Sequence, residues 1–419
     1  MDCDPGIMPS SPDTILTVND FSWVNGGTAQ VALAGLRGLS TTSKELVFLY
    51  AVGPPPEDLL ERGVQCVGLG QQDILSDSNR ARAMVRGLWN TKAARTLKAL
   101  LHRRDPARTI VHVHGWSKAL SGSIFRVARQ QGFPILLTLH DYFAACPNGG
   151  LYNYRTDRLC TLRPLGPRCL VTNCDVRHMS HKAWRLARQY VQRYAAGLPG
   201  HIQHYIYTSE TARSLLKSHL PGTASFYRVD NPIPMEQAPP AAVSENSCFV
   251  FLGRLAREKG IGLFAEAVTA AGVEGVVIGS GPEEEALRRA FPSIRWTGWQ
   301  SPDAVRTMLR KARCLVFPSV LYETQGLVVR EAAALGVPAI VSDVTAAREW
   351  VDPGRNGLLF ASGSPDSLTE KIVQLRDNDS LAATLGKEAY RRYWDRPTTT
   401  ADHAEALLGV YEKVLASPR

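Results

Sequence analysis

Glu323 and Glu331 are the side chains whose type and spacing point most directly to chemistry. They lie in the segment Pro318–Asp343, which predicts a strand, a loop that carries Glu323, and an Ala-rich helix that opens near Gly326 and stops at Gly336. The free N–H groups at a helix start bind anions, whereas a carboxylate accepts hydrogen bonds from neighbouring hydroxyl groups. We therefore expect a site for a hydroxyl-rich ligand with an anionic group. The alternative is that both glutamates are exposed helix residues.

A second candidate is a pair of cations, Arg254 and Lys259, which follow a predicted strand that ends at Gly253. A guanidinium fork and an ammonium point charge at this spacing could hold a diphosphate. On spacing alone, the favoured alternative is that both cations lie on a solvent-exposed helix start.

Two glycine turns add weaker signals for a binding site, because glycine lets a backbone approach a ligand closely. They are Gly26-Gly27 after the first strand, and Gly279-Ser-Gly281 after a later one.

Alternating strand and helix patterns must position these residues, and they predict an α/β fold with parallel, doubly wound sheets. The predicted strands of the first half are 14–19, 46–51, 110–114, 135–139 and 202–208, with helices that include 28–39 and 88–101. A proline-rich linker follows, and the alternation restarts with strands at 248–252, 273–278, 294–297, 314–318 and 338–342. The 419-residue chain is thus predicted to have Rossmann-like domains at 1–232 and 247–395, a linker at 233–246, and a C-terminal helix in 396–419 that packs back on the first domain. Ligands of such sheets bind at the carboxyl ends of the strands, so we expect the active site in a cleft between the two domains.

Taken in order, these motifs closely resemble the retaining glycosyltransferases of the GT-B fold, family 4, over most of the chain. The matching motifs are Gly26-Gly27, Leu139-His140-Asp141, Asn231-Pro232, Gly253-Arg254 with Lys259-Gly260, Gly279-Ser280-Gly281-Pro282, Pro318-Ser319, Glu323 with Glu331, and Gly336-Val337-Pro338. One departure is Gln325, where an aromatic residue or proline is common in the family, and this leaves the identity of the sugar open.

The resemblance implies a nucleotide-diphosphate sugar donor, carried by UDP or GDP, and specific roles for the matching residues. The implied catalytic residues are His140, Asp141, Arg254, Lys259 and Glu323. The implied donor-binding residues are Gly26, Gly27, Gly253, Arg254, Lys259, Gly279, Gly298, Glu323, Thr324, Gln325, Gly326, Leu327 and Glu331. Arg254 and Lys259 would hold the diphosphate, Glu331 the ribose and Glu323 the sugar, while Gly298 would lie at the base and His140 on the acceptor side. Asp141 has the alternative of a structural loop cap. No Asp-x-Asp motif is evident and two cations can replace a divalent ion, so we expect no cofactor to be required for catalysis.

Four cysteines, Cys146, Cys160, Cys169 and Cys174, fall in an unusual insert at 146–181. Four thiols, or three thiols with a histidine, could hold a structural zinc ion in tetrahedral geometry. The gaps between them are wider than those of a C-x-x-C knuckle, so reduced thiols are an equal alternative, and a disulfide or redox cluster is a third.

The net charge of +9 is uneven, with +11 on residues 1–232 and −2 on the remainder. The basic half, and a basic helical pattern at 181–198, suggest an anionic membrane surface or an anionic substrate. The alternative for that helix is packing on the sheet. No nucleic-acid-binding motif accompanies the charge, so we expect no nucleic acid partner.

Residues 1–11 lack a secretory signal pattern, and no apolar run is long enough to span a bilayer. We therefore expect a cytoplasmic protein, with peripheral attachment to the inner face of the membrane as an option.

Together these features predict a retaining, metal-independent hexosyltransferase with a polyprenyl-diphosphate-linked or oligosaccharide acceptor, acting in surface or exopolysaccharide synthesis. The alternatives are a phosphorylase or epimerase on the same fold, and a non-catalytic sugar-nucleotide or zinc scaffold protein. Charge alone would suggest a nucleic-acid binder.

Overall fold

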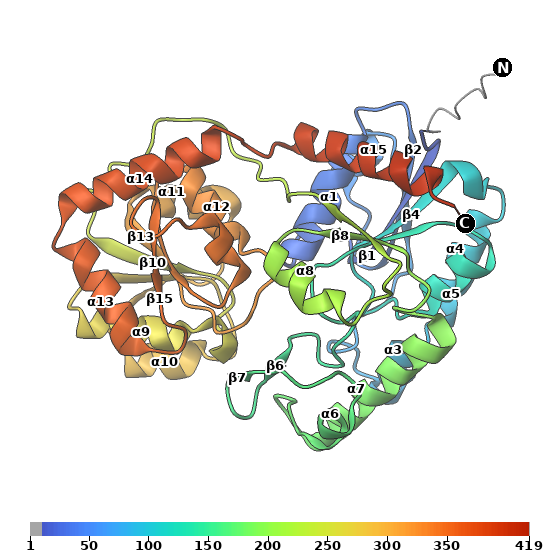
Figure 1. Cartoon of the computed structure of the whole chain (residues 1–419), viewed down its shortest axis with the longest axis horizontal. Coiled ribbons are helices and arrows are strands. Elements are labelled where there is room, and N and C mark those ends of the chain that lie inside the picture. The colour runs from blue at the N-terminus through green and yellow to red at the C-terminus, as the bar shows by residue number, and fades with distance from the viewer. Residues whose placement is uncertain (1–10, 419) are drawn as a thin grey trace. The chain divides into compact units, whose positions relative to one another are not determined.

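Two parallel sheets organise the chain in the computed structural model, which describes residues 11–418 (Figure 1). The first compact unit combines the described part of Met1–Gly149 with Leu162–Pro232 and Thr398–Arg419, and the second combines Gly150–Thr161 with Ile233–Pro397. The prediction of an α/β fold with two Rossmann-like sheets is confirmed. The expectation about a secretory signal falls almost entirely on residues 1–10, which lie outside the described residues, as does Cys3.

The first unit contains a seven-stranded sheet with the order β3-β2-β1-β4-β5-β8-β9, and all its strand pairs are parallel. Its central strands are buried along their whole length, as is typical of parallel sheets. Its strands are β1 Thr14–Phe21, β2 Glu45–Val52, β3 Gln65–Gly68, β4 Thr109–Val113, β5 Ile135–Thr138, β8 His204–Tyr207 and β9 Ser225–Arg228. The five predicted strands of this half are present, whereas the short edge strands β3 and β9 carry too few apolar residues to be predicted.

The helices of this unit are α1 Gly27–Leu39, α2 Glu57–Glu61, α3 Arg80–Leu88, α4 Thr91–Leu101, α5 Ser123–Gln130, α6 Pro167–Val171, α7 Met179–Val191, α8 Glu210–Lys217 and α15 Thr400–Ala416. The predicted helix at 88–101 begins too early. Leu88 ends α3, and the Asn90 side chain caps α4 by accepting from the Ala93 N–H. The predicted basic helix at 181–198 is α7, followed by a π-helical turn at Gln192–Ala196.

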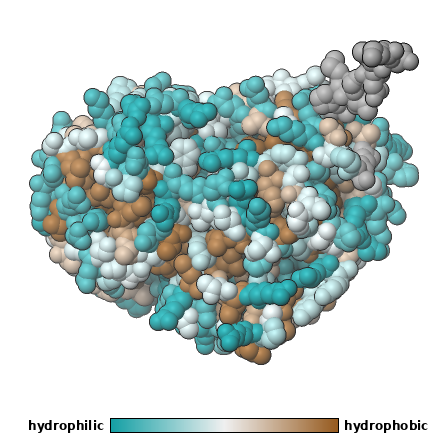
Figure 2. All heavy atoms as spheres, in the orientation of Figure 1, coloured by the Kyte–Doolittle hydropathy of each residue, from teal (hydrophilic) through white to brown (hydrophobic). Residues whose placement is uncertain are grey.

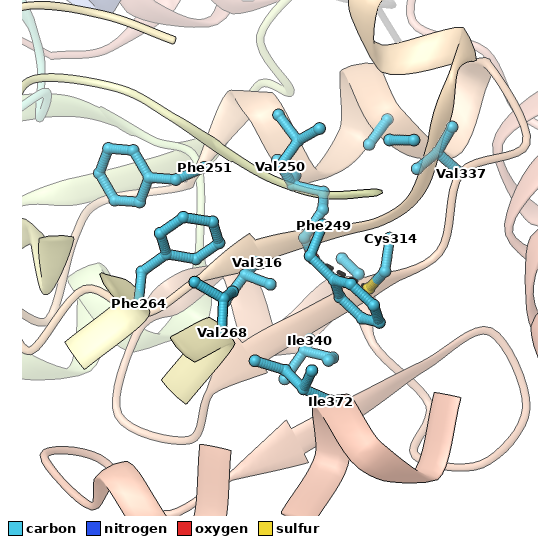
Figure 3. Close-up of a cluster of buried hydrophobic side chains, with 14 of the residues drawn as sticks. Phe249, Val250, Phe251, Phe264, Val268, Cys314, Val316, Val337, Ile340 and Ile372 are labelled. Atoms are coloured by element: carbon cyan, nitrogen blue, oxygen red, sulfur yellow. Dashed lines mark hydrogen bonds between the residues drawn. The ribbon is translucent and has the colours of Figure 1, made fainter. Parts of the chain in front are cut away.

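The second unit contains a six-stranded parallel sheet with the order β12-β11-β10-β13-β14-β15. Its strands are β10 Cys248–Leu252, β11 Gly275–Ile278, β12 Arg295–Trp296, β13 Ala312–Phe317, β14 Ala339–Ser342 and β15 Gly357–Phe360. Its helices are α9 Ile261–Ala270, α10 Glu284–Ala290, α11 Pro302–Arg310, α12 Leu327–Ala334, α13 Pro365–Arg376 and α14 Asp379–Trp394. Figure 3 shows its core, where Phe249 and Val316 of the sheet lie among side chains of α9 and α13 such as Val268 and Ile372.

The C-terminal helix α15 packs on α1 within the first unit, where Leu407 and Tyr411 share one buried cluster with Leu33 and Leu36. The Tyr411 hydroxyl shares a hydrogen bond of 2.8 Å with His112 Nδ1. This helix therefore completes the core of the unit in which the chain begins.

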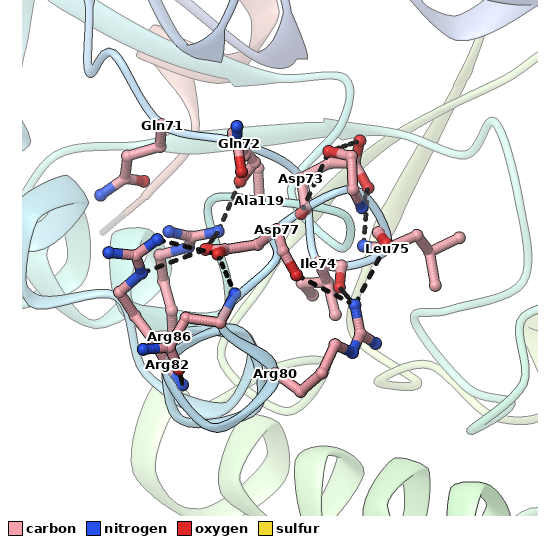
Figure 4. A network of polar contacts seen from close by, with 12 residues as sticks. Gln71, Gln72, Asp73, Ile74, Leu75, Asp77, Arg80, Arg82, Arg86 and Ala119 are labelled. Atoms are coloured by element: carbon pink, nitrogen blue, oxygen red, sulfur yellow. Dashed lines mark hydrogen bonds and ion pairs between the residues drawn. The ribbon is translucent and has the colours of Figure 1, made fainter.

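A hairpin of β6 (Tyr152–Asn153) and β7 (Arg158–Leu159) lies within the segment 150–161 of the second unit. In the first unit, the buried Asp77 carboxylate lies between Arg82 and Arg86 and holds the loop before α3 (Figure 4).

The surface seen in Figure 2 mixes hydrophilic and hydrophobic side chains. Among the described helices, none combines the length and the apolar character that crossing a membrane requires.

Candidate active site

The loops that follow β10 and β13 bring a cation and a carboxylate together in the second unit. Lys259 Nζ donates to Glu323 Oε1 at 2.6 Å, and Ser319 Oγ donates to the same oxygen at 2.7 Å. The two charged side chains stay partly open to solvent, with 29% of Lys259 and 15% of Glu323 exposed. A carboxylate held by a cation and a hydroxyl group has a fixed direction, which suits it to orient a ligand.

Glycine allows these two loops to touch backbone to backbone. Gly260 has φ +72°, and a Cβ atom there would lie 2.0 Å from the Pro318 carbonyl oxygen. A second close approach involves Gly279, where a Cβ atom would lie 2.0 Å from the Gly253 carbonyl oxygen. The Gly279 N–H donates to the Gly298 carbonyl at 2.9 Å, so the turns after β10, β11 and β12 are linked. The motif glycines therefore build one surface at the carboxyl ends of the strands.

Glu323 itself has φ +48°, in the left-handed region that non-glycine residues rarely occupy. This conformation costs about 1 kcal/mol or more and persists where the surrounding contacts fix it. The hydrogen bonds from Lys259 and Ser319 are such contacts. Strained residues of this kind concentrate at functional sites.

Helix α12 presents the other motif residues. Gly326, with φ +78°, precedes its first residue Leu327, and Glu331 is half-buried in its second turn. Thr324 and Gln325 lie in the preceding loop, where Gln325 is buried. Arg254 lies directly after Gly253 and is exposed. The structure thus places the predicted donor-binding residues of this half on adjoining loops and one helix start.

The sequence prediction missed the residue that anchors α12. Arg330 is buried, and its guanidinium lies 4.0 Å from the centre of the Trp350 ring. This stacking ties the helix to the turn Ala346–Trp350. The only signal for Arg330 in the sequence is that it directly precedes Glu331.

In the first unit, Gly26 and Gly27 form the start of α1, and His140 follows β5. His140 Nε2 shares a hydrogen bond of 3.0 Å with His114 Nδ1, and the two rings stack. Burial, together with the charge of His403, lowers the pKa of His140 to about 3. His140 is therefore neutral near pH 7 and can exchange hydrogen bonds with a hydroxyl group. The sequence prediction missed His114, although the pair His112 and His114 at the end of β4 was a visible signal.

Asp141 has the geometry of a loop cap, which was the alternative to a catalytic role. Its Oδ1 accepts from the Phe143 N–H at 2.9 Å. Burial raises the pKa of Asp141 to about 6, against the opposing effect of that hydrogen bond.

No zinc site is seen at the cysteines of the insert within the described residues. The Lys182 ammonium reaches the Cys174 sulfur at 3.2 Å and the Cys169 sulfur at 3.6 Å, so a cation already occupies the thiol cluster. Across residues 11–418, no three metal-ligating side chains are placed to hold one ion.

Residues 246–378 match the family model described as "Glycosyl transferases group 1". Among curated relatives, the phosphatidyl-myo-inositol mannosyltransferase of Mycobacterium leprae (strain TN) is 30% identical over 181 residues, which are 40% of this chain and 47% of that protein. The chain spans about half the length of the curated relatives it matches.

Solved structures share the whole fold. A sucrose-phosphate synthase from Thermosynechococcus elongatus has a TM-score of 0.72 at 18% identity, covering 97% of this chain and all of that one. The Anabaena protein HepE in complex with UDP has a TM-score of 0.65 at 14% identity, with coverage of 96% and 100%. The second half of the chain is thus similar to group 1 glycosyl transferases, and the whole described chain shares the GT-B fold of these solved structures.

Proposed function

We propose that the chain transfers a hexose from a nucleotide-diphosphate sugar to a hydroxyl group of its acceptor, with retention of configuration and without a metal ion. The observation that carries the proposal is the contact of Lys259, Ser319 and Glu323 at the carboxyl ends of β10 and β13. A cation and an oriented carboxylate side by side suit the two halves of such a donor, because its diphosphate is anionic and its sugar is rich in hydroxyl groups.

In this proposal, Arg254 and Lys259 hold the diphosphate, and Glu323 with the amides of 324–327 holds the sugar. Glu331 accepts hydrogen bonds from the ribose, and Gly298 lies near the base. Cleavage of the glycosyl–phosphate bond places positive charge on the sugar and negative charge on the leaving diphosphate. Fixed cations and backbone N–H groups at the leaving group stabilise this transition state. The two cations can supply the charge that a divalent ion would otherwise provide.

His140 belongs to the acceptor side of the reaction. Because its pKa lies far below 7, the imidazole is neutral and acts as a hydrogen-bonding group rather than a fixed charge. His114 orients it through their shared hydrogen bond.

The donor is a UDP- or GDP-sugar, and HepE was solved with UDP, which makes UDP the first nucleotide to try. Thermal unfolding of the purified protein is measured with UDP, GDP, ADP and their sugars. A nucleotide at about 100 times its dissociation constant stabilises by roughly 2.7 kcal/mol, which raises Tm by a few degrees. A selective shift with one base supports the donor assignment, and no shift with any nucleotide contradicts it.

The variant Glu323→Gln tests the chemical role of this carboxylate. We expect transfer to fall at least 100-fold while the Tm shift with the nucleotide diphosphate alone persists, because Glu323 is assigned to the sugar. The matched variant Glu331→Gln should instead weaken nucleotide binding. Unchanged turnover of Glu323→Gln would overturn the assignment.

Two further measurements test the rest of the proposal. Retention is determined from the anomeric configuration of the product by NMR, and metal independence from unchanged turnover in the presence of a chelator.

For the acceptor we propose a saccharide or a polyprenyl diphosphate carrying one, in surface or exopolysaccharide synthesis. The support is the excess positive charge of residues 1–232 and the lipid-modifying relative, a phosphatidyl-myo-inositol mannosyltransferase. The same charge would hold the protein peripherally at the inner face of the membrane. Sedimentation with vesicles that contain anionic lipid, compared with neutral vesicles, tests this location.

A further inference from the structure

The thiol cluster of the insert contains a buried lysine in an unusual environment. Lys182 on α7 is 1% exposed, and its Nζ donates to the sulfur of Cys174 at 3.2 Å and of Cys169 at 3.6 Å. Both cysteines are free thiols that are less than one-tenth exposed. Lysine is almost never this buried unless it is paired with an opposite charge.

No carboxylate supplies that charge. Within residues 11–418, no carboxylate oxygen lies within 4.0 Å of Lys182 Nζ. The acidic residue nearest in sequence, Asp175, is paired with Arg185 at 2.7 Å. The partners of the amine are therefore sulfur atoms.

The cluster also contacts the loop that follows His140 and Asp141. Asn148 Nδ2 donates to the Cys174 sulfur at 3.3 Å, and the Cys146 thiol donates to Asn148 Oδ1 at 3.0 Å. A chemical change at Cys174 would therefore reach this loop directly.

We propose that Lys182 and Cys174 form an oxidative modification site, in which dioxygen links Lys182 Nζ to Cys174 Sγ through a single oxygen atom. The amine, the thiol and one O2 give an N–O–S bridge and one water. New N–O and O–S bonds form and the O–O bond breaks. Of the three hydrogens carried by nitrogen and sulfur, two leave in the water and one stays on nitrogen. Nitrogen and sulfur each lose two electrons, and these reduce O2 to the bridging oxygen and the water. A reductant thiolate that attacks the bridged sulfur breaks the O–S bond, forms a mixed disulfide and leaves a hydroxylamine on Lys182. Further thiol reduces the disulfide to the Cys174 thiol and the N–O bond to the amine and water.

Cleavage after arginine separates the two partners and makes the test direct. The peptide Cys169–Arg177 holds both cysteines, and the peptide His178–Arg185 holds Lys182. Protein exposed to air-saturated buffer is digested without reductant, and its peptides are compared by mass spectrometry with those of a sample kept anaerobic with reductant. We expect a joined peptide about 14 Da heavier than the sum of the two, which disappears on reduction.

Three variants test separately whether the Lys182 amine and the Cys174 sulfur are required for the link. Lys182→Arg keeps the positive charge but removes the lysine amine, so the joined peptide should be lost. Cys174→Ser should also abolish it, whereas Cys169→Ser should retain it, because Cys174 is the nearer thiol. Cys66, a free thiol in β3, serves in the same digest as an unmodified reference.

Three results would overturn the proposal. They are a Cys169–Cys174 disulfide, seen as a loss of about 2 Da within one peptide, a zinc ion retained in the native mass spectrum, and unchanged peptides after oxidation. The mass measurement uses the wild-type protein, so it does not depend on a variant that folds. It is also independent of transfer activity and of nucleotide binding.

Discussion

At the scale of single residues, the second unit combines a cation, a hydroxyl group and a carboxylate held in a left-handed conformation. The sequence predicted Lys259 and Glu323 because each follows a strand end within a few residues. It did not predict the partners of His140 or Arg330. These contacts, His114 to His140 and Arg330 to Trp350, join residues about 20 or more positions apart, and spacing along the chain carries no signal for them.

Lys259→Met should weaken nucleotide-diphosphate binding about 10- to 100-fold, because it removes a point charge from the proposed diphosphate site. The unfolding free energy should change by less than about 1 kcal/mol, since the ion pair is partly exposed. Binding is measured by calorimetry with the nucleotide that shifts Tm.

Lys311→Met is the matched control. Lys311 is exposed and directly precedes β13, so it lies at the opposite end of the strand from Ser319. Its removal should leave nucleotide affinity unchanged. Equal losses in both variants would mean that the effect is general surface charge.

At the scale of elements, the sequence predicted the buried strands well and the edges and caps poorly. β10 matches its prediction of 248–252 because a continuous apolar run has one plausible assignment. The helix expected at 88–101 is present as α4, but its predicted start was wrong, because Asn90 caps the helix and the apolar pattern continues across that break. Cysteine spacing in the insert did not reveal that Cys160 belongs to another unit than the remaining three thiols.

The contact between the β10 and β13 loops predicts a strong effect of Gly260→Ala. A Cβ atom 2.0 Å from the Pro318 carbonyl, at φ +72°, forces the loops apart and separates Lys259 from Glu323. We expect a loss of about 2–4 kcal/mol in unfolding free energy, together with weaker nucleotide binding. Urea unfolding and calorimetry measure the two effects.

Gly262→Ala, two residues further on in α9, is the control. Nothing lies within 4 Å of a Cβ atom at this position. Because alanine favours a helix over glycine, this variant should be neutral or more stable by up to about 1 kcal/mol. Destabilisation of both variants by the same amount would contradict the argument from loop contact.

At the scale of the whole molecule, the first unit buries several groups whose protonation differs between the folded and unfolded states. Burial is the main cause in each case, and it lowers the pKa of four histidines and raises that of two aspartates. They are His112, His114, His140 and His403, and Asp20 and Asp141.

We therefore predict that this unit loses stability as the pH falls from about 6.5 to 5. In this window the unfolded chain binds a proton at each histidine while the folded unit does not, and each such proton changes stability by about 1.4 kcal/mol per pH unit. The two aspartates act in the opposite direction, because burial raises their pKa and makes the folded unit bind protons more readily than the unfolded chain, and they offset only part of the change.

Urea unfolding at pH 7.5, 6.5 and 5.5, followed by tryptophan fluorescence, to which the buried Trp116 of this unit contributes, measures this dependence. His178→Asn, at an exposed position before α7, should leave the slope unchanged. A stability that rises between pH 6.5 and 5.5 would contradict the assignment of buried neutral histidines.

The packing of α15 on α1 has a consequence for synthesis on the ribosome. The first unit cannot close until residues 400–416 have emerged, although the last strand of its sheet ends at Arg228. Until then the apolar side chains of α1 that α15 covers, such as Leu33 and Leu36, face water or a chaperone. A premature stop after residue 397 would spare every strand of both sheets. In the truncated product the apolar face of α1, near the N-terminus, would stay uncovered, and chaperones would recognise the product there.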